Sequence, residues 1–200
     1  PLVPLNLRNK AKLACIPTTS GTGSEVSGVA VISFPDGIKL PVAGALPEFV
    51  PDFALLDPTL TVGMPPELTA GTGADALAHA IEAYTSTIAS SFTEMQSLKA
   101  IDLILRHLPL AVETISYDSL EQLSIASVAA SMAFSNASLG AEHALAHSLG
   151  GHFDMRHGAI HPILLTAVMR FNLDAAETKL GNIGRVILDR NVGSARETAL

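Results

Sequence analysis

The sequence predicts a short α/β segment followed by an all-α domain. Residues 1–60 are rich in proline, glycine and β-branched residues, and short apolar runs alternate there with turns. From Pro65 onward prolines become rare, alanine becomes frequent, and apolar residues recur at the spacing of helices. We therefore divide the chain near Pro58 to Pro65, into an α/β edge over 1–60 and a helical domain over 61–200.

Four short strands are predicted in the first segment. Leu13 to Ile16 precedes Pro17 and has the apolar character of a buried strand, and Gly28 to Ile32 is the second candidate. The runs 39–42 and 53–56 give weaker signals. Because four short strands form a poor core alone, we interpret this segment as the edge of a larger α/β domain.

The second segment predicts a succession of helices. In the run from Leu98 to Leu108, apolar residues form one stripe and charged residues face the other way, which is typical of an amphipathic helix. Pro109 is expected to end that helix. The predicted helices cover 66–71, 72–87, 91–107, 119–137, 139–150, 158–172 and 175–188.

Composition excludes several classes of function. The formal net charge of −7 and the absence of a Lys/Arg cluster argue against nucleic-acid binding. The lone Cys15 excludes an internal disulfide and a thiolate zinc cluster. No apolar run reaches the roughly 18 residues of a membrane span, so we expect no membrane insertion and a cytoplasmic location. The chain begins with Pro1 rather than methionine, and we expect it to be a fragment.

Two stretches of the helical segment contain candidate metal ligands. Asp75 and His79 are four residues apart and therefore share one face of a helix, and His143 and His147 repeat that spacing. His157 follows the Gly150-Gly151 break, where the chain can fold back. One carboxylate oxygen with imidazole nitrogens suits Zn²⁺ or Fe²⁺. Taken singly, a histidine on an apolar helix is better explained by packing than by metal binding, and the zincin pattern His-Glu-x-x-His is absent.

Several motifs together resemble one known family. The stretch Asp75-Ala-Leu-Ala-His79-Ala-Ile-Glu82, the stretch Gly140-Ala-Glu-His143 and the tripeptide Arg156-His157-Gly158 resemble the iron-containing (group III) alcohol dehydrogenases. The loop Pro17-Thr-Thr-Ser-Gly-Thr-Gly-Ser-Glu25 resembles the same family. Matching stretches extend from Cys15 to Asn172 in the family's order and spacing.

The resemblance implies a fold and a set of site residues. Members have the dehydroquinate synthase-like architecture, in which an N-terminal dinucleotide-binding α/β domain precedes an all-helical domain and the active site lies in the cleft between them. Carried over by position, the metal ligands are Asp75, His79, His143 and His157, and His147 lies beside nicotinamide and substrate. The cofactor-binding residues implied are Thr18, Thr19, Thr22, Val31 and Lys39.

Three departures from the family pattern stand out. The Gly-Gly-Gly-Ser segment that binds the pyrophosphate in the family is absent, as is the rest of the first domain. Arg156 stands where proline is commonest, and His161-Pro162 stands where the family usually has Asn-Ala. Surface or packing roles are expected for three histidines without a family assignment, His107, His152 and His161.

The prediction is a metal-dependent oxidoreductase that transfers a hydride between an alcohol or aldehyde and NAD or NADP, with Fe²⁺ or else Zn²⁺ as the ion. A homo-oligomer, specifically a dimer, is expected, and no nucleic-acid partner. Two alternatives stay open at this point: a zinc-dependent polyol (glycerol-type) dehydrogenase, and a truncated, inactive module that only mediates association.

Overall fold

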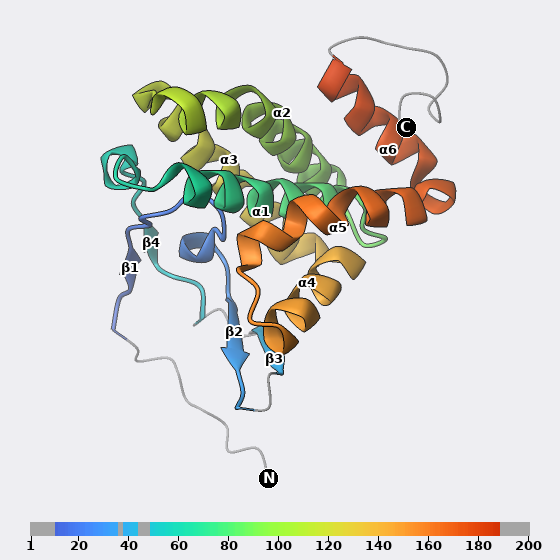
Figure 1. The fold of residues 1–200 in the computed structure, drawn as a ribbon, viewed down its shortest axis with the longest axis horizontal. Coiled ribbons are helices and arrows are strands. Elements are labelled where there is room, and N and C mark those ends of the chain that lie inside the picture. Colours follow the sequence, from blue (N-terminus) through green and yellow to red (C-terminus); the bar gives the residue numbers. More distant parts are fainter. Residues whose placement is uncertain (1–10, 36–37, 44–48, 189–200) are drawn as a thin grey trace.

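In the part of the chain that the structure describes, six α-helices pack together, and two pairs of short strands lie along one side of them (Figure 1). The computed structural model describes residues 11–35, 38–43 and 49–188. The predicted 1–60 segment therefore includes three stretches, 1–10, 36–37 and 44–48, that lie outside the described residues. The predicted fold class is confirmed: a small α/β remnant precedes a helical domain.

Helix α1 (Pro66–Thr85) is the central element and contacts every other helix. The helix begins at Pro66, a position where the backbone N–H would have no partner within the helix, so its absence in proline has no cost. The negative charge of Glu67 in the first turn interacts favourably with the positive end of the helix dipole. Its interior is lined by small residues with almost no exposed surface, Ala76, Ala78, Ala80 and Ala83. Neighbouring helices can therefore approach closely. The sequence predicted two helices here, 66–71 and 72–87, and the structure has one.

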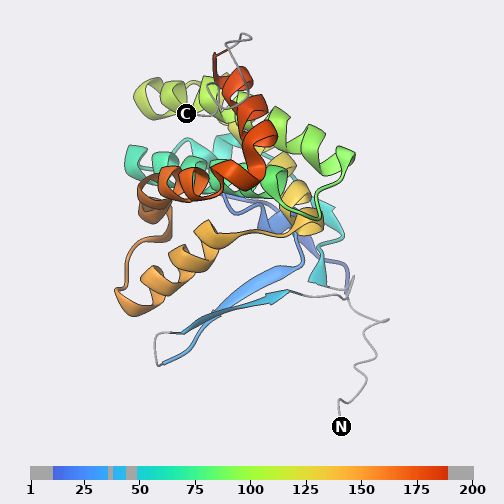
Figure 2. The same cartoon turned by 90° about the vertical axis from the view of Figure 1, so that its right-hand side faces the viewer.

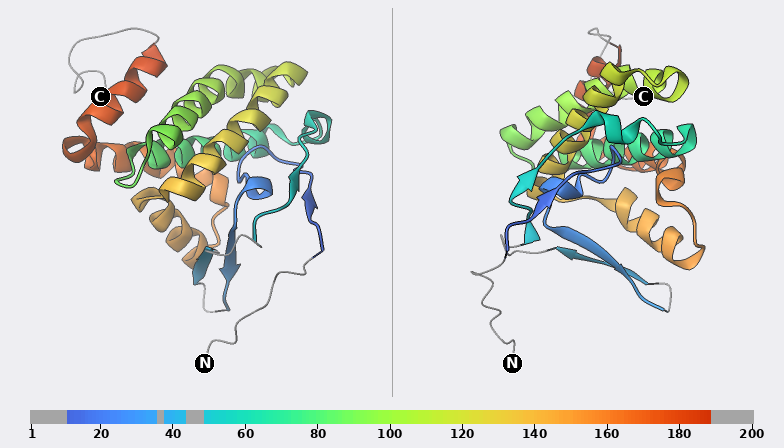
Figure 3. Two further views of the ribbon diagram at one scale, coloured as in Figure 1. Left: turned by 180° about the vertical axis from the view of Figure 1, so that it is seen from behind. Right: turned by 90° about the vertical axis from the view of Figure 1, so that its left-hand side faces the viewer.

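Helices α2 (Ser91–Thr114) and α3 (Tyr117–Ala137) pack on each other and on α1 (Figure 3). Ser90 and Thr93 form a reciprocal capping box at the start of α2. The prediction that Pro109 ends this helix is wrong, because α2 continues to Thr114 with Pro109 inside it. Ala111 in the continuation is 2% exposed within the core, so packing outweighs the backbone hydrogen bond that proline cannot make.

The remaining helices are α4 (Ala141–His152), α5 (His157–Phe171) and α6 (Leu173–Leu188). Helix α6 bends at Ala176 and contributes Leu173, Leu180 and Ile183 to the core shared with α1, α2 and α3. Within the described residues, no single helix is long and apolar enough to cross a membrane; α3 and α4 together would be, but they meet at 103°.

The strands form two separate pairs. Strands β1 (Ala14–Cys15) and β4 (Phe53–Ala54) are parallel, with Ala14 opposite Phe53. Strands β2 (Val29–Ser33) and β3 (Lys39–Ala43) are antiparallel, with Val31 opposite Pro41, and form a hairpin that extends past α4 (Figure 2). Four strands were predicted, and all four are present at shifted bounds. Short 3-10 helices, η2 (Ser24–Val26) and η4 (Pro58–Thr61), complete the segment.

Candidate metal centre and cofactor cavity

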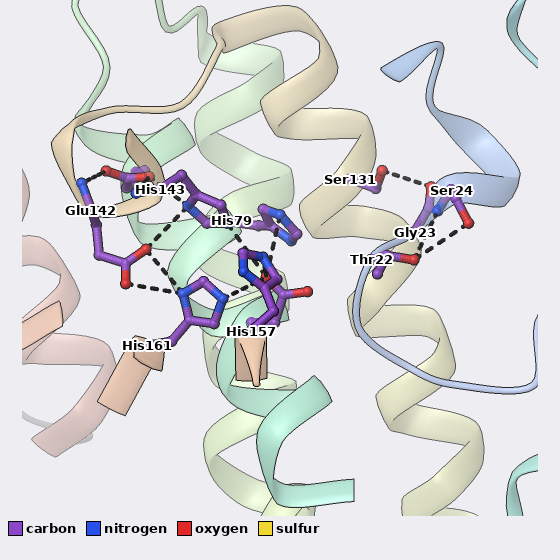
Figure 4. Close-up of polar contacts among 11 residues, drawn as sticks. Thr22, Gly23, Ser24, His79, Ser131, Glu142, His143, His157 and His161 are labelled. Carbon is purple, nitrogen blue, oxygen red and sulfur yellow. Dashed lines mark hydrogen bonds and ion pairs between the residues drawn. The ribbon is translucent and has the colours of Figure 1, made fainter. Parts of the chain in front are cut away.

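The candidate metal centre lies where α1, α4 and α5 meet. Helix α1 supplies Asp75 and His79 one turn apart, and α4 supplies His143. Helix α5 supplies a second pair one turn apart, His157 and His161. Figure 4 shows the four imidazoles turned toward one another from these three helices. Only the side chain of His157 is substantially exposed, at 35%.

One carboxylate oxygen is the common neighbour of all four rings. Oδ1 of Asp75 lies 3.5 Å from Nε2 of His79 and 3.4 Å from Nε2 of His143. The same oxygen lies 3.6 Å from Nε2 of His157 and 3.1 Å from Nε2 of His161. Four nitrogen donors and one oxygen donor thus converge on a small volume.

These separations are those expected of atoms that share one metal ion. Two donors each about 2.1 Å from an ion lie about 3.0 Å apart at right angles and about 3.4 Å apart in a tetrahedron. Nε2 of His161 is buried and has no hydrogen-bond partner among residues 11–35, 38–43 and 49–188, which leaves it an orphaned polar atom inside the cluster. One donor atom from each of Asp75, His143, His157 and His161 lies within 4.8 Å of all the others. The residues therefore fit a divalent metal ion.

Two buried glutamates contact the far side of two of these rings, His143 and His161. Glu82 accepts hydrogen bonds from the backbone N–H of Glu142 (2.8 Å) and from Nδ1 of His143 (2.7 Å). Glu142 lies 3.2 Å from the same Nδ1 and accepts from Nδ1 of His161 at 2.9 Å. A carboxylate behind the distal nitrogen is the usual setting of a metal-binding histidine, because it fixes the tautomer and the ring orientation.

Asp75 and the histidines of the cluster shift one another's pKa values. Burial alone would raise the pKa of Asp75, but His79, His143 and His161 lower it well below its usual value. Burial lowers the pKa of His79 and of His157 to about 4, so both rings are neutral at pH 7. Burial opposes protonation of His161, yet Asp75 and Glu142 raise its pKa to about 9. Without an ion His161 therefore holds a proton that a metal would displace.

A cavity of about 830 Å³ opens beside the cluster. Asp75, His79, His143 and His157 form part of its wall, and the predicted His147 lines it as well. Three of the five predicted cofactor residues line the same cavity, Thr22, Val31 and Lys39. Thr18 and Thr19 are not among its described lining residues.

His147 lies next to the donors but outside their common neighbourhood. Its ring centroid is 5.3 Å from that of His157 and 6.1 Å from that of His143. Burial and the nearby His143 lower its pKa, and the charge of Lys39 acts in the same direction. The ring is half-buried at the cavity wall, where a small molecule could reach it.

The threonine-rich loop is anchored on α3 by close packing. Gly23 has φ +57°, and a Cβ there would lie 2.2 Å from Cβ of Ser131, so only glycine fits. The Ser131 hydroxyl donates to the Gly23 carbonyl at 2.8 Å, as Figure 4 shows. Glu25 is buried, which raises its pKa, and its carboxylate accepts from its own backbone N–H. The anchored loop brings Thr22 to the cavity.

Comparison with models of known protein families shows which family the chain belongs to. The family model for the C-terminal domain of the Fe-containing alcohol dehydrogenases matches residues 69–199, and the model for iron-containing alcohol dehydrogenase matches residues 3–58. The chain belongs to the iron-containing alcohol dehydrogenase family. The resemblance inferred from the sequence motifs is thereby confirmed.

Relatives of this chain include several named enzymes. It is 51% identical over 161 residues to a 1-propanol dehydrogenase of Citrobacter freundii, covering 78% of this chain and 42% of the relative. It is 43% identical over 182 residues to an NADPH-dependent butanol dehydrogenase of Clostridium saccharobutylicum, covering 90% and 46%. The chain thus spans about half the length of the curated relatives it matches.

Solved structures give the same picture of the fold. A 1,3-propanediol oxidoreductase superimposes with a TM-score of 0.88 at 39% identity, covering 94% of this chain and 50% of that one. An iron-containing alcohol dehydrogenase from Thermococcus thioreducens superimposes with a TM-score of 0.85 at 37% identity, covering 95% and 49%.

Sequence reasoning missed one residue of the centre. His161 was expected on the surface or in ordinary packing, but it has no exposed surface and lies closest of the four rings to Oδ1 of Asp75. A signal was present, since His157 and His161 repeat the spacing of Asp75 and His79, although the predicted helix began only at residue 158. The other two unassigned histidines lie elsewhere: His107 is 3.9 Å from Asp118, and His152 is exposed.

Proposed function

We propose that the full-length protein is a metal-dependent NAD(P) alcohol dehydrogenase and that this chain supplies its metal centre and part of its cofactor site. The observation that carries the proposal is the convergence of four imidazoles on Oδ1 of Asp75 at the wall of an 830 Å³ cavity. Family membership supports the same reaction class.

Asp75, His79, His143 and His157 would hold Fe²⁺, or Zn²⁺ in its place. Bound there, the ion supplies a Lewis acid for the alcohol oxygen in one direction and for the carbonyl oxygen in the other. Asp75 stays ionised because its pKa is lowered, and so contributes the one full negative charge among these donors. Glu82 holds the ring of His143 in place from behind.

The cavity wall would place the dinucleotide and the substrate. Lys39 brings a positive charge from β3 toward α4, which suits a phosphate or another anionic part of NAD or NADP. The hydroxyl of Thr22 and the apolar side chain of Val31 line the same cavity. His147 is positioned to orient the substrate or to carry its hydroxyl proton away from the cavity.

We propose a small primary alcohol, or the corresponding aldehyde, as the substrate. The relatives' names support this class, because they include 1-propanol, butanol and 1,3-propanediol dehydrogenases. A dimeric state and a cytoplasmic location remain predictions from the sequence.

Two alternatives are decided by one experiment. A zinc-dependent polyol dehydrogenase would show glycerol-dependent activity with Zn²⁺ and none with propanol. An inactive association module would show neither activity nor metal binding. We expect the full-length protein to reduce NAD(P)⁺ with 1-propanol or butanol once Fe²⁺ is supplied, and Asp75→Ala to abolish this activity. Activity that persists fully in Asp75→Ala would contradict the proposal.

A further inference from the structure

His161 lies inside the candidate metal centre at a position that the family-derived ligand set leaves out. Its ring is fully buried, and its Nε2 lies 3.1 Å from Oδ1 of Asp75. The other three rings lie 3.4–3.6 Å from that oxygen. A buried ring nitrogen that neither binds a ligand nor forms a hydrogen bond is an unusual cost to the fold.

Glu142 determines which nitrogen faces the centre. Its two carboxylate oxygens lie 2.9 and 3.0 Å from Nδ1 of His161 (Figure 4), so Nδ1 carries the proton in the neutral ring and donates it to the carboxylate. Nε2 then carries the lone pair. This nitrogen has no hydrogen-bond partner among the described residues, although an oxygen lies only 3.1 Å away, so the contact is off the hydrogen-bonding direction.

The setting of His161 can be compared with that of His79, which the family pattern makes a ligand. Nδ1 of His79 has no hydrogen-bond partner in the described part of the chain, whereas Nδ1 of His161 has a carboxylate. The donor atom of His161 also lies within 4.8 Å of those of Asp75, His143 and His157. The carboxylate partner of Nδ1 therefore makes His161 at least as well suited to bind a metal as His79.

We propose that His161 is an additional ligand of the metal ion, held in its binding tautomer by Glu142. The inference rests on the metal centre of the proposed function and adds a donor to it. The competing interpretation is that the ring of His161 only forms a hydrogen bond with Asp75. In that case the nitrogen of His161 would be absent from the coordination shell of the metal.

The test uses the metal-stripped full-length protein loaded with Co²⁺, which reports its ligands through its visible absorption spectrum. His161→Asn and His161→Gln are compared with His152→Asn, a matched change at an exposed histidine of α4. Affinity is measured by competition with a chromogenic chelator. Folding of each variant is followed by circular dichroism. If the short side chain of His161→Asn disturbs the core, His161→Gln provides a longer side chain whose amide group can stay near Glu142.

We expect both His161 variants to bind Co²⁺ about 100-fold more weakly or worse and to change its spectrum, with His152→Asn unchanged. Glu142→Gln should weaken binding about 10–100-fold while keeping the spectrum, because it acts only through the ring of His161 and its neighbour His143. In the Co²⁺ wild type, a paramagnetically shifted exchangeable imidazole proton should be present and should disappear in both His161 variants.

An unchanged Co²⁺ spectrum and an unchanged set of shifted protons in folded His161→Asn would overturn this inference alone. Failure of the wild type to bind Co²⁺ would overturn the metal centre of the proposed function as well. Asp75→Ala separates the two results, since it should abolish binding whether or not His161 is a ligand.

Discussion

Gly158 of α5 packs directly on the backbone of Gly71 in α1. A Cβ added at Gly158 would lie 2.7 Å from the carbonyl carbon of Gly71 and 2.8 Å from its Cα. No side chain separates the two helices at this point, and the contact lies between the turns that carry Asp75 and His157. The distance from Asp75 to the two histidines of α5 therefore depends on two glycines.

Gly158→Ala should lower stability and loosen the metal centre together. The added methyl meets backbone atoms that cannot rotate away, so α5 must shift, at a cost of about 1–3 kcal/mol of unfolding free energy. Urea unfolding and chelator competition measure the two effects. Gly63→Ala is the matched control, because no atom of the described residues lies within 4 Å of a Cβ at Gly63. Equal metal affinity in Gly158→Ala and wild type would contradict the role given to this contact.

His79→Ala and His147→Ala should separate metal binding from turnover. Loss of His79 removes a donor 3.5 Å from Oδ1 of Asp75, so metal content and activity should fall together. Loss of His147, whose ring lies beside the donors at the cavity wall, should lower kcat by about 10–100-fold with metal retained. Elemental analysis beside a dehydrogenase assay measures both. Complete metal loss in the His147 variant would make that residue a ligand.

The metal-free protein should be most stable near pH 6.5. The folded-state pKa of His79 and of His157 is lowered to about 4, so the unfolded chain takes up protons first and stability falls as pH drops from 6.5 to 4. The pKa of His161 is raised to about 9, so its contribution is complete below 6.5 and is lost as pH rises through 9.

Urea unfolding of the stripped protein at about pH 5, 6.5 and 8.5 measures this profile. His161→Asn should reduce the alkaline decrease, while His152→Asn should leave it unchanged. A metal-free wild type equally stable at about pH 6.5 and pH 8.5 would show that the charge assigned to His161 is wrong.

Lys39→Ala should weaken NAD(P) binding by about 10- to 150-fold, because a hydrogen bond to a charged group contributes about 1.5–3 kcal/mol. Lys99→Ala is the control, since that side chain is 62% exposed and pairs with Asp102 on α2. Fluorescence titration with NADH and NADPH gives the dissociation constants. Equal constants for Lys39→Ala and Lys99→Ala would remove Lys39 from the cofactor site.

Local spacing was sufficient to place most of the helices and to pair Asp75 with His79, but not to set the bounds of α1 and α2. Asp75 and His79 share a helix face by their four-residue separation, and the structure brings them within 3.5 Å. The effect of Pro109 could not be predicted, because it depends on the burial of Ala111 against other helices. Local rules predict that a helix ends at a proline, but in α2 tertiary packing stabilises a helix that continues past Pro109.

The position of His161 in the centre also could not be predicted from local sequence patterns. Its proximity to Asp75 arises from the packing of α5 on α1, and its partner Glu142 comes from α4. No single stretch contains this combination. Thr18 and Thr19 were expected at the cofactor site with Thr22, yet among the described residues only Thr22 of the three lines the cavity. The loop is held on α3 by the hydrogen bond from Ser131 to the Gly23 carbonyl, a contact between residues 108 positions apart that local sequence patterns do not reveal.

Protein purified in air should contain substoichiometric iron or adventitious zinc. The donors include no thiolate, and nitrogen and oxygen donors bind Zn²⁺ more tightly than Fe²⁺ in the usual divalent series. Availability during growth and purification therefore decides which ion is found. Elemental analysis of the protein as purified, beside protein prepared under anaerobic conditions with added Fe²⁺, tests this. Full iron occupancy after aerobic purification would contradict it.

The most direct test of the account is reconstitution of the metal-stripped full-length enzyme with each ion in turn. Alcohol-dependent formation of NAD(P)H is followed by absorbance under anaerobic conditions, with Asp75→Ala as the control that lacks the central carboxylate. We predict no turnover without metal, recovery with Fe²⁺, and no recovery in Asp75→Ala. Equal activity with no metal at all would contradict the Lewis-acid role and leave Asp75 and its histidines with a different task.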